Sequence, residues 1–194
     1  MLIGVYQSII TLVTVCGFYA MDFVFMYKYD RQRQTGKGWA WDYTLLTIFF
    51  GLIITIQPLL VPGLGWHTAS FIGLALQLIG LAFIVASFIF HMWARLHLRR
   101  FYAERVEVQP GHQLVETGPY ALVRHPVITS FFGLVIGLFL INPAIPTLLL
   151  IIYAFWDFSN AARQEEILLS KSLPDYPAYL ERTPRFLPNL WRRK

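Results

Sequence analysis

Long runs of apolar residues alternate with short charged blocks along this chain. The apolar runs cover residues 2–27, 43–62, 68–92, 127–141 and 144–156. A helix needs about 20 apolar residues to cross the roughly 30 Å hydrocarbon core of a bilayer, so the first three runs predict membrane-spanning helices. The last two runs are shorter, and only Asn142 and Pro143 separate them. They predict a tight helical hairpin that crosses by thinning the bilayer locally or by burial among the longer helices.

The charged blocks predict the orientation of these helices. All 16 lysines and arginines fall within residues 28–42, 93–125 and 157–194. Five spans place these three blocks on one side of the membrane, whereas an even number of spans would separate them. Because basic residues accumulate on the cytoplasmic side, we expect the N-terminus outside and the C-terminus in the cytoplasm.

The composition agrees with an integral, multi-pass membrane protein. Hydrophobic residues make up 56% of the 194 residues and charged residues 14%, whereas soluble domains carry about 25% charged residues. This excludes a disordered chain and an ordinary soluble domain. The net charge of +5 would suit nucleic acid, but the orientation of membrane helices explains it better, so we expect membrane lipids and no nucleic acid as partners. The predicted fold class is therefore all-α, with about five transmembrane helices.

Small residues in two of the apolar runs predict close helix contacts. Gly133 and Gly137 form a GxxxG pair, and Ala82 and Ala86 form a similar pair. Pairs of this spacing let two helix backbones approach closely in a membrane. They serve either the packing of one chain or a weak homo-oligomer, and a monomer remains the alternative.

Asp22 is the only one of the 11 acidic residues that lies outside the charged blocks. A charge within a membrane helix is costly and usually faces the interior of the bundle. We expect its carboxylate to accept a hydrogen bond from Gln57 or Gln77. A role in a tunnel for a lipid substrate is the alternative.

Two charged segments leave membrane helices on the predicted cytoplasmic side. In residues 93–125, the first part extends the third helix to about Tyr102, and the Arg124–Pro126 turn opens the fourth helix. Proline suits the first turn of a helix, whose free amide groups favour anionic ligands. In residues 157–194, the fifth helix continues outward, and Pro184–Pro188 predicts an extended segment that docks elsewhere. These features predict a site at the membrane–cytoplasm boundary.

A spaced motif in this region resembles the core signature of the isoprenylcysteine carboxyl methyltransferase family, which is related to the phospholipid methyltransferases. The motif reads His112-x-Leu114-Val115-x-x-Gly118-Pro119-Tyr120-x-x-x-Arg124-His125-Pro126. Glu165 and Glu166, which follow the last apolar run, resemble the family's C-terminal part. The resemblance covers roughly residues 93–190 and suggests a prokaryotic-type member. The chain departs from the pattern at Ile128, where the family usually has tyrosine, and at Ser130, where it usually has glycine.

This resemblance implies a division of the chain and a cofactor. Residues 1–92 would form three N-terminal membrane helices. Residues 93–194 would form the catalytic region, made of a connector (93–125), the hairpin (126–156) and a cytoplasmic C-terminal segment (157–194). The methyl donor would be S-adenosylmethionine, with S-adenosylhomocysteine as the product.

The resemblance also implies roles for individual residues. The donor site would be formed by His112, Gln113, Leu114, Val115, Gly118, Tyr120, His125, Pro126, Val127, Ile128 and Glu165. Catalytic roles would fall to Arg163, Glu165 and Glu166, with Arg163 holding a substrate carboxylate. Adjacent glutamates on a helix point about 100° apart, so we expect one of the two to contact the donor. His67, His91 and His97 lack partners at metal-ligand spacing, so no metal is expected.

The implied activity is methyl transfer to a lipophilic acceptor that enters sideways from the bilayer. The acceptor expected first is the carboxylate of a prenylated cysteine or of a related lipid. The alternatives are a phospholipid amine, or an NADPH-dependent reduction of the sterol reductase type. A small transporter or scaffold is a non-enzymatic alternative, but the polar residues gather in the cytoplasmic segments rather than along the spans.

Overall fold

The structure, a computed structural model, describes residues 4–30, 41–60, 70–98 and 114–188. Every regular element in these ranges is helical, which confirms the all-α prediction. The elements are α1 (Val5–Asp30), α2 (Trp41–Leu60), α3 (Phe71–Leu98), the 3-10 turn η2 (Gly118–Ala121), α4 (Pro126–Ile141), α5 (Ile145–Ser172) and α6 (Tyr176–Arg182).

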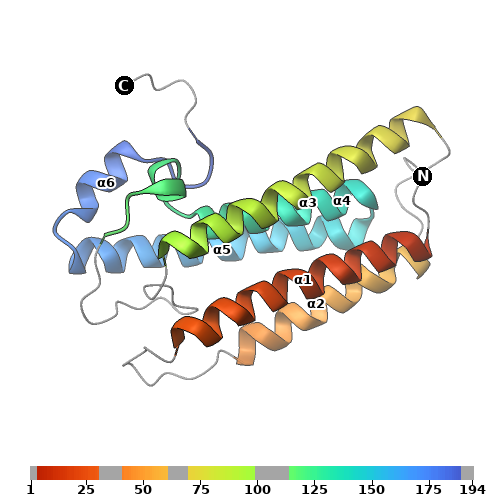
Figure 1. The fold of residues 1–194 in the computed structure, drawn as a ribbon, viewed down its shortest axis with the longest axis horizontal. Helices are drawn as coiled ribbons and strands as arrows, with labels where there is room; N and C mark the ends of the chain where they lie inside the picture. Colours follow the sequence, from red (N-terminus) through yellow and green to blue (C-terminus); the bar gives the residue numbers. More distant parts are fainter. Residues whose placement is uncertain (1–3, 31–40, 61–69, 99–113, 189–194) are drawn as a thin grey trace.

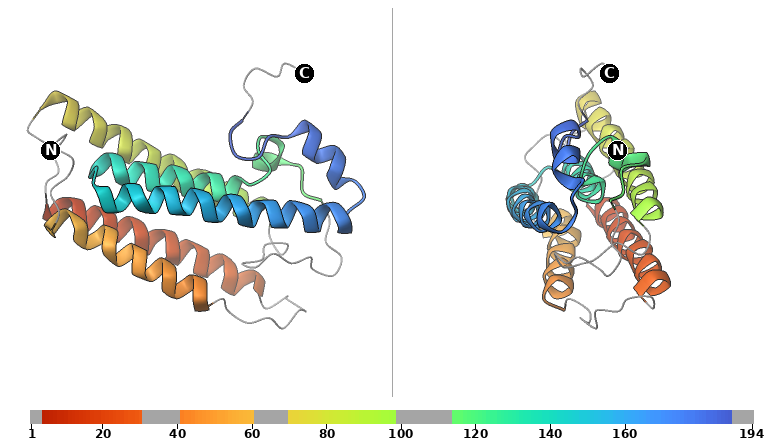
Figure 2. Two further views of the ribbon diagram at one scale, coloured as in Figure 1. Left: turned by 180° about the vertical axis from the view of Figure 1, so that it is seen from behind. Right: turned by 90° about the vertical axis from the view of Figure 1, so that its left-hand side faces the viewer.

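The helices form an elongated bundle of two groups. Helices α1 and α2 lie side by side as an antiparallel pair, and α3, α4 and α5 form a second group along them (Figure 1). The turn between α4 and α5 lies at the same end of the bundle as the start of α1, whereas α6 lies at the other end (Figures 1 and 2).

Three of the described helices are long and apolar enough to cross a membrane: α1 over Val5–Phe25, α3 and α5. The apolar parts of α2 (Ile48–Leu60) and α4 (Pro126–Ile141) are shorter. The count of five spans and the orientation of the termini therefore stay predictions. All charged residues of α5 lie after Trp156, so its second half extends beyond the apolar segment without a break in the helix.

Helices α3 and α4 pack closely because glycines meet where they cross. A Cβ atom added to Gly137 would lie 2.7 Å from the carbonyl oxygen of Gly80, and one added to Gly133 would lie 2.5 Å from Oγ of Ser87. The GxxxG pair thus makes the predicted close contact. Ala82 and Ala86 are exposed, so the expectation of a contact at this pair is wrong for the described residues.

Asp22 does not pair with either predicted glutamine. Its Oδ1 lies 2.7 Å from Nε2 of His91 and accepts hydrogen bonds from Nε and Nη2 of Arg95, at 2.9 and 2.6 Å. The glutamines bond elsewhere: Gln77 Nε2 donates to the carbonyl of Ile141, and Gln57 Oε1 accepts from the hydroxyl and amide of Thr147. The ion pair balances the charge of the half-buried Asp22 carboxylate, which a neutral amide could not do.

Candidate functional site at one end of the bundle

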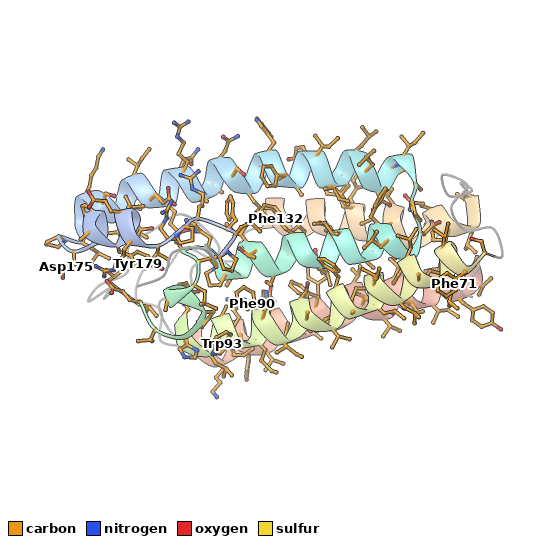
Figure 3. All side chains as sticks on the ribbon, turned by 90° about the horizontal axis from the view of Figure 1, so that it is seen from above. Phe71, Phe90, Trp93, Phe132, Asp175 and Tyr179 are labelled. Carbon is orange, nitrogen blue, oxygen red and sulfur yellow. The ribbon has the colours of Figure 1, made fainter. Side chains whose placement is uncertain are left out.

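The residues of the predicted site come together at the end of the bundle that carries α6. They belong to η2, the start of α4, the second half of α5, and residues 183–188. Figure 3 shows that Asp175 and Tyr179 lie at the same end of the molecule as Trp93 near the end of α3, while Phe71 lies at the opposite end. This cluster therefore lies beyond the apolar segment of α5, while a site at the membrane–cytoplasm boundary stays a prediction.

Glu166 is the centre of this site. Its carboxylate is buried, with 7% of the side chain exposed. Oε1 accepts hydrogen bonds from Nε of Arg124 at 2.9 Å and Nε of Arg185 at 3.0 Å, and lies 3.1 Å from Nε2 of His125. Oε2 accepts a further hydrogen bond from Nη2 of Arg185. Both oxygens of Glu166 are thus occupied by groups of the protein.

Glu165 is the accessible carboxylate of the pair. Its side chain is 45% exposed, and its Oε2 lies 3.3 Å from Nδ1 of His125. Because carboxylate oxygens only accept, the contacts of His125 with Glu165 and Glu166 are both satisfied when both ring nitrogens carry a proton. His125 therefore acts as a charged bridge between two carboxylates that point in different directions from α5.

The electrostatics of the cluster follow from burial and ion pairing. Burial alone would raise the pKa of Glu166, but the hydrogen bonds from His125 and Arg185 and the charges of His125 and Arg124 lower it to about 2. Burial alone would lower the pKa of His125, but hydrogen bonds and charges of Glu165 and Glu166 raise it. The hydrogen bond to Glu166 raises the pKa of Arg185. Arg124, Arg185 and the protonated form of His125 thus surround two carboxylates.

The C-terminal segment docks on the turn that opens α4. The amide of Arg124 donates to the carbonyl of Pro184 at 2.9 Å, and the amide of His125 donates to the carbonyl of Arg185 at 3.1 Å. The hydroxyl of Thr129 donates to the carbonyl of Phe186 at 2.9 Å. The extended segment predicted at Pro184–Pro188 therefore holds the signature turn in place.

Aromatic contacts fix the same segment from its other side. The ring of Phe186 lies 5.3 Å from that of Phe132, 5.9 Å from that of His125 and 6.3 Å from that of Phe155. These contacts connect the segment to α4 and α5. They bury apolar surface next to the ion-paired cluster, which lowers water access to it.

The tyrosines of α6 attach η2 to the end of α5. Tyr176 and Tyr179 are buried and pack with Leu169, and the hydroxyl of Tyr179 donates to the carbonyl of Tyr120 at 2.6 Å. Burial raises the pKa of both tyrosine hydroxyls, so they remain neutral hydrogen-bond donors. In η2, Gly118 has a φ of +61°, a left-handed conformation that favours glycine. The Gly-Pro-Tyr turn is thus fixed by its own backbone and by α6.

The predicted donor residues differ in accessibility. Tyr120, His125 and Pro126 are buried, whereas five others are half-buried: Leu114, Val115, Gly118, Val127 and Ile128. Leu114 also lines a cleft of about 540 Å³ between the start of the described motif and α6. His112 and Gln113 lie outside the described residues. Arg163 is exposed, and its guanidinium makes no ion pair or hydrogen bond with a side chain of the described residues.

Sequence reasoning missed Arg185, which the structure places at the site. The only signal for it was the extended segment predicted from Pro184, Phe186 and Pro188, within which it lies. Arg124 belongs to the motif, but its contacts were open from sequence. It donates to Glu166 and to the carbonyls of Leu180 and Thr183. In the described part of the chain, no three His, Cys, Asp or Glu residues are grouped to hold a metal ion.

Comparison with protein families and comparison with solved structures point to the same family. Residues 78–171 match the sequence model of the isoprenylcysteine carboxyl methyltransferase family. The eukaryotic intramembrane Ras methyltransferase ICMT has a similar fold, with a TM-score of 0.59 and 21% sequence identity, over 96% of this chain and 71% of that one. At this identity the likeness concerns the fold.

Two curated relatives carry names from metal resistance. The nickel-cobalt-cadmium resistance protein NccN of Alcaligenes xylosoxydans xylosoxydans is 27% identical over 132 residues, which are 68% of this chain and 58% of that protein. The cobalt-zinc-cadmium resistance protein CzcN of Cupriavidus metallidurans is 25% identical over 137 residues, 70% of this chain and 52% of that protein. The chain thus spans little more than half the length of these relatives.

Proposed function

Because residues 78–171 of this chain belong to the isoprenylcysteine carboxyl methyltransferase family, we propose that the protein is a membrane methyltransferase that uses S-adenosylmethionine. Its acceptor is a lipophilic carboxylate, such as that of a prenylated cysteine. The observation that carries this proposal is the arrangement of Glu165, Glu166 and His125 beside the signature turn.

The chemistry of these residues fits the donor. Glu166 is occupied on both oxygens, whereas the partly exposed carboxylate of Glu165 is available to accept from the donor's ammonium or ribose hydroxyls. The half-buried Val127 and Ile128 offer apolar surface to the methyl and thioether groups. When His125 is protonated, three cations around two carboxylates leave a positive charge that attracts a carboxylate, whether of the donor's amino-acid part or of the acceptor.

The proposed reaction is an in-line displacement. An acceptor oxygen forms a bond to the methyl carbon while the bond from that carbon to sulfur breaks, and the electron pair of that bond stays on sulfur. A carboxylate acceptor is already ionised near pH 7, so the step requires no general base. The protein contributes alignment and proximity, which account for most of the rate gain in reactions of this kind. In this scheme, Glu166 and Arg185 position His125 and the turn, and Glu165 contacts the donor.

Isothermal titration of the detergent-solubilised protein with S-adenosylhomocysteine tests the donor site, with NADPH titrated in parallel. We expect S-adenosylhomocysteine to bind and Glu165→Gln to weaken its binding at least tenfold. Glu181→Gln is the matched control, because Glu181 is exposed on α6 and belongs to neither the cluster nor the predicted donor residues, and it should leave the affinity unchanged. Selective binding of NADPH would instead support a reductase and overturn the proposal.

A transfer assay then addresses the acceptor. The protein in proteoliposomes is given methyl-labelled S-adenosylmethionine with either a farnesyl-cysteine analogue or phosphatidylethanolamine. Base-labile label on the prenylcysteine marks a methyl ester and supports a carboxylate acceptor. Base-stable label on the lipid amine would support the phospholipid alternative.

A further inference from the structure

A buried polar chain runs through the apolar part of the bundle and ends at the signature turn. Oδ1 of Asp22 in α1 lies 2.7 Å from Nε2 of His91 in α3, and Nδ1 of His91 lies 2.9 Å from Oγ of Ser130 in α4. The hydroxyl of Ser130 donates to the carbonyl of Val127 at 2.6 Å. The chain therefore connects three helices and ends in the first turn of α4, which the proposed donor site uses.

The chain of Asp22, His91 and Ser130 is not a catalytic triad of the hydrolase type. Ser130 is 2% exposed and His91 1% exposed, so neither meets a substrate. The hydroxyl of Ser130 donates its hydrogen bond to the carbonyl of Val127. In a hydrolase triad Nε2 of the histidine faces the serine, whereas here Nδ1 of His91 faces Ser130 and Nε2 faces Asp22. The chain is built to hold atoms in place.

The first turn of α4 needs such support. His125 occupies the N-cap position and makes no side-chain capping bond to the turn, and the first helical residue is Pro126. On the side of the C-terminal segment, the turn is held by Thr129 and Phe186. On the side of α3, it is held by Ser130 and His91. The two sides together determine where Val127 and Ile128 lie relative to Glu165.

Asp22 and Arg95 fix the other end of the chain. Arg95 is 2% exposed and pairs with Asp22, and its guanidinium lies 5.9 Å from the ring of Phe25. The ring of Phe18, one turn before Asp22, lies 4.4 Å from that of His91. His91 is thus oriented by α1 on one face and by Asp22 at its Nε2, which leaves its Nδ1 directed at Ser130.

We propose that Asp22, His91 and Ser130 are positioning residues for the methyl-donor site. Through them, α1, which lies outside the matched family region, sets the position of the first turn of α4. This inference rests on the proposed function, because the position of the turn is measured through the affinity for the methyl donor.

Two substitutions that each remove one buried hydroxyl group test the inference. Ser130→Ala removes the link to α3, and Thr147→Val removes the buried hydrogen bond from the Thr147 hydroxyl to Gln57 at the opposite end of the bundle, while the amide of residue 147 still donates to Gln57. Each variant is titrated with S-adenosylhomocysteine, and its thermal unfolding is followed in the same detergent. We expect both variants to unfold at a lower temperature, while Ser130→Ala alone raises the dissociation constant at least fivefold.

Two further measurements separate a specific effect on the first turn of α4 from a general loss of stability. Hydrogen exchange in a peptide covering residues 126–131 should quicken in Ser130→Ala and stay unchanged in Thr147→Val. Asp22→Asn, two links further away, should shift affinity in the same direction by a smaller factor. If Ser130→Ala and Thr147→Val leave the affinity equally unchanged, the positioning role is overturned. If the wild-type protein binds no S-adenosylhomocysteine, the proposed function itself has failed.

Discussion

Arg185 and Glu166 form a two-point ion pair, with Nε and Nη2 of the arginine each donating to a different carboxylate oxygen. The pair joins the C-terminal segment to α5 across the signature turn. Since Arg124 and His125 also contact Glu166, one buried carboxylate holds together three separate parts of the chain.

Glu166→Gln is therefore expected to reduce stability more than Glu165→Gln does. Loss of the charge leaves Arg124 and Arg185 without their anion, which should cost about 2 kcal/mol for the charged hydrogen bonds. Glu165 is 45% exposed and has one weak contact, so Glu165→Gln should keep its unfolding temperature and lose donor affinity instead. Thermal unfolding of the two variants in one detergent compares them, and equal losses of stability would contradict the assigned roles.

The stability of the protein should fall both at acid pH and at alkaline pH. The pKa of Glu166 falls from its ordinary 4.5 to about 2, so its contribution is present above pH 4.5 and is lost as pH falls toward 2. The pKa of His125 is raised above its ordinary 6.5, so its contribution is complete below pH 6.5 and is lost as pH rises through the folded value. We expect the highest unfolding temperature between these limits.

Two variants identify the groups behind this pH profile. His125→Gln should flatten the decline on the alkaline side, and Glu166→Gln should flatten the decline on the acid side. Unfolding followed by circular dichroism from about pH 2 to 8.5 gives both limbs. A His125→Gln profile that still declines on the alkaline side like the wild type would assign that limb to another group.

Phe186→Ala should detach the C-terminal segment. The ring contacts His125, Phe132 and Phe155, and removing this half-buried surface should cost about 1–2 kcal/mol. Donor affinity should fall about tenfold in titration, because the segment holds the turn. Leu187→Ala is the neighbouring control, since Leu187 is 78% exposed, and a similar loss in that variant would refute a specific role for Phe186.

Gly137→Ala should force α3 and α4 apart. The new methyl group would lie 2.7 Å from the backbone oxygen of Gly80, which has no rotamer to change. We expect a loss of about 1–3 kcal/mol, as for other overpacked interiors. In Gly133→Ala the nearest atom is the hydroxyl of Ser87, which rotates away, so its unfolding temperature should drop less. The reverse order would show that the closest approach lies at Gly133.

Cysteine labelling tests the predicted orientation. With Cys16 replaced by alanine, Ser70→Cys and Ser172→Cys each supply a single exposed thiol near opposite ends of the bundle. A membrane-impermeant maleimide should label Ser70→Cys in intact cells and Ser172→Cys only after lysis. Labelling in the opposite pattern would place the site outside the cell.

Most of the helices and the core of the site were predictable from sequence because their signals are local. Apolar runs, the Gly-Pro-Tyr turn and the Pro126 helix start each depend on neighbouring residues. The partner of Asp22 was not predictable in this way, because His91 lies 69 positions away and Gln57 and Gln77 were equally plausible partners. Long-range pairing of buried charges is decided by which helix faces meet.

The sequence of an apolar helix does not show which of its faces packs against other helices. A membrane helix is apolar toward lipid and toward its neighbours, so hydrophobic periodicity does not mark the packed side. For this reason the small pair at Ala82 and Ala86 was indistinguishable from the true contact at Gly80. Arg185 was missed for a related reason, since its partner Glu166 lies on a different element and no local pattern connects them.

The docking of residues 183–186 also determines when the site can exist during synthesis. These residues leave the ribosome after every helix from α1 to α6 has been made. Until then, the amides of Arg124 and His125 lack the carbonyls of Pro184 and Arg185, and Glu166 lacks Arg185. A nascent chain or a fragment clipped before residue 183 would hold all its helices but not the completed site.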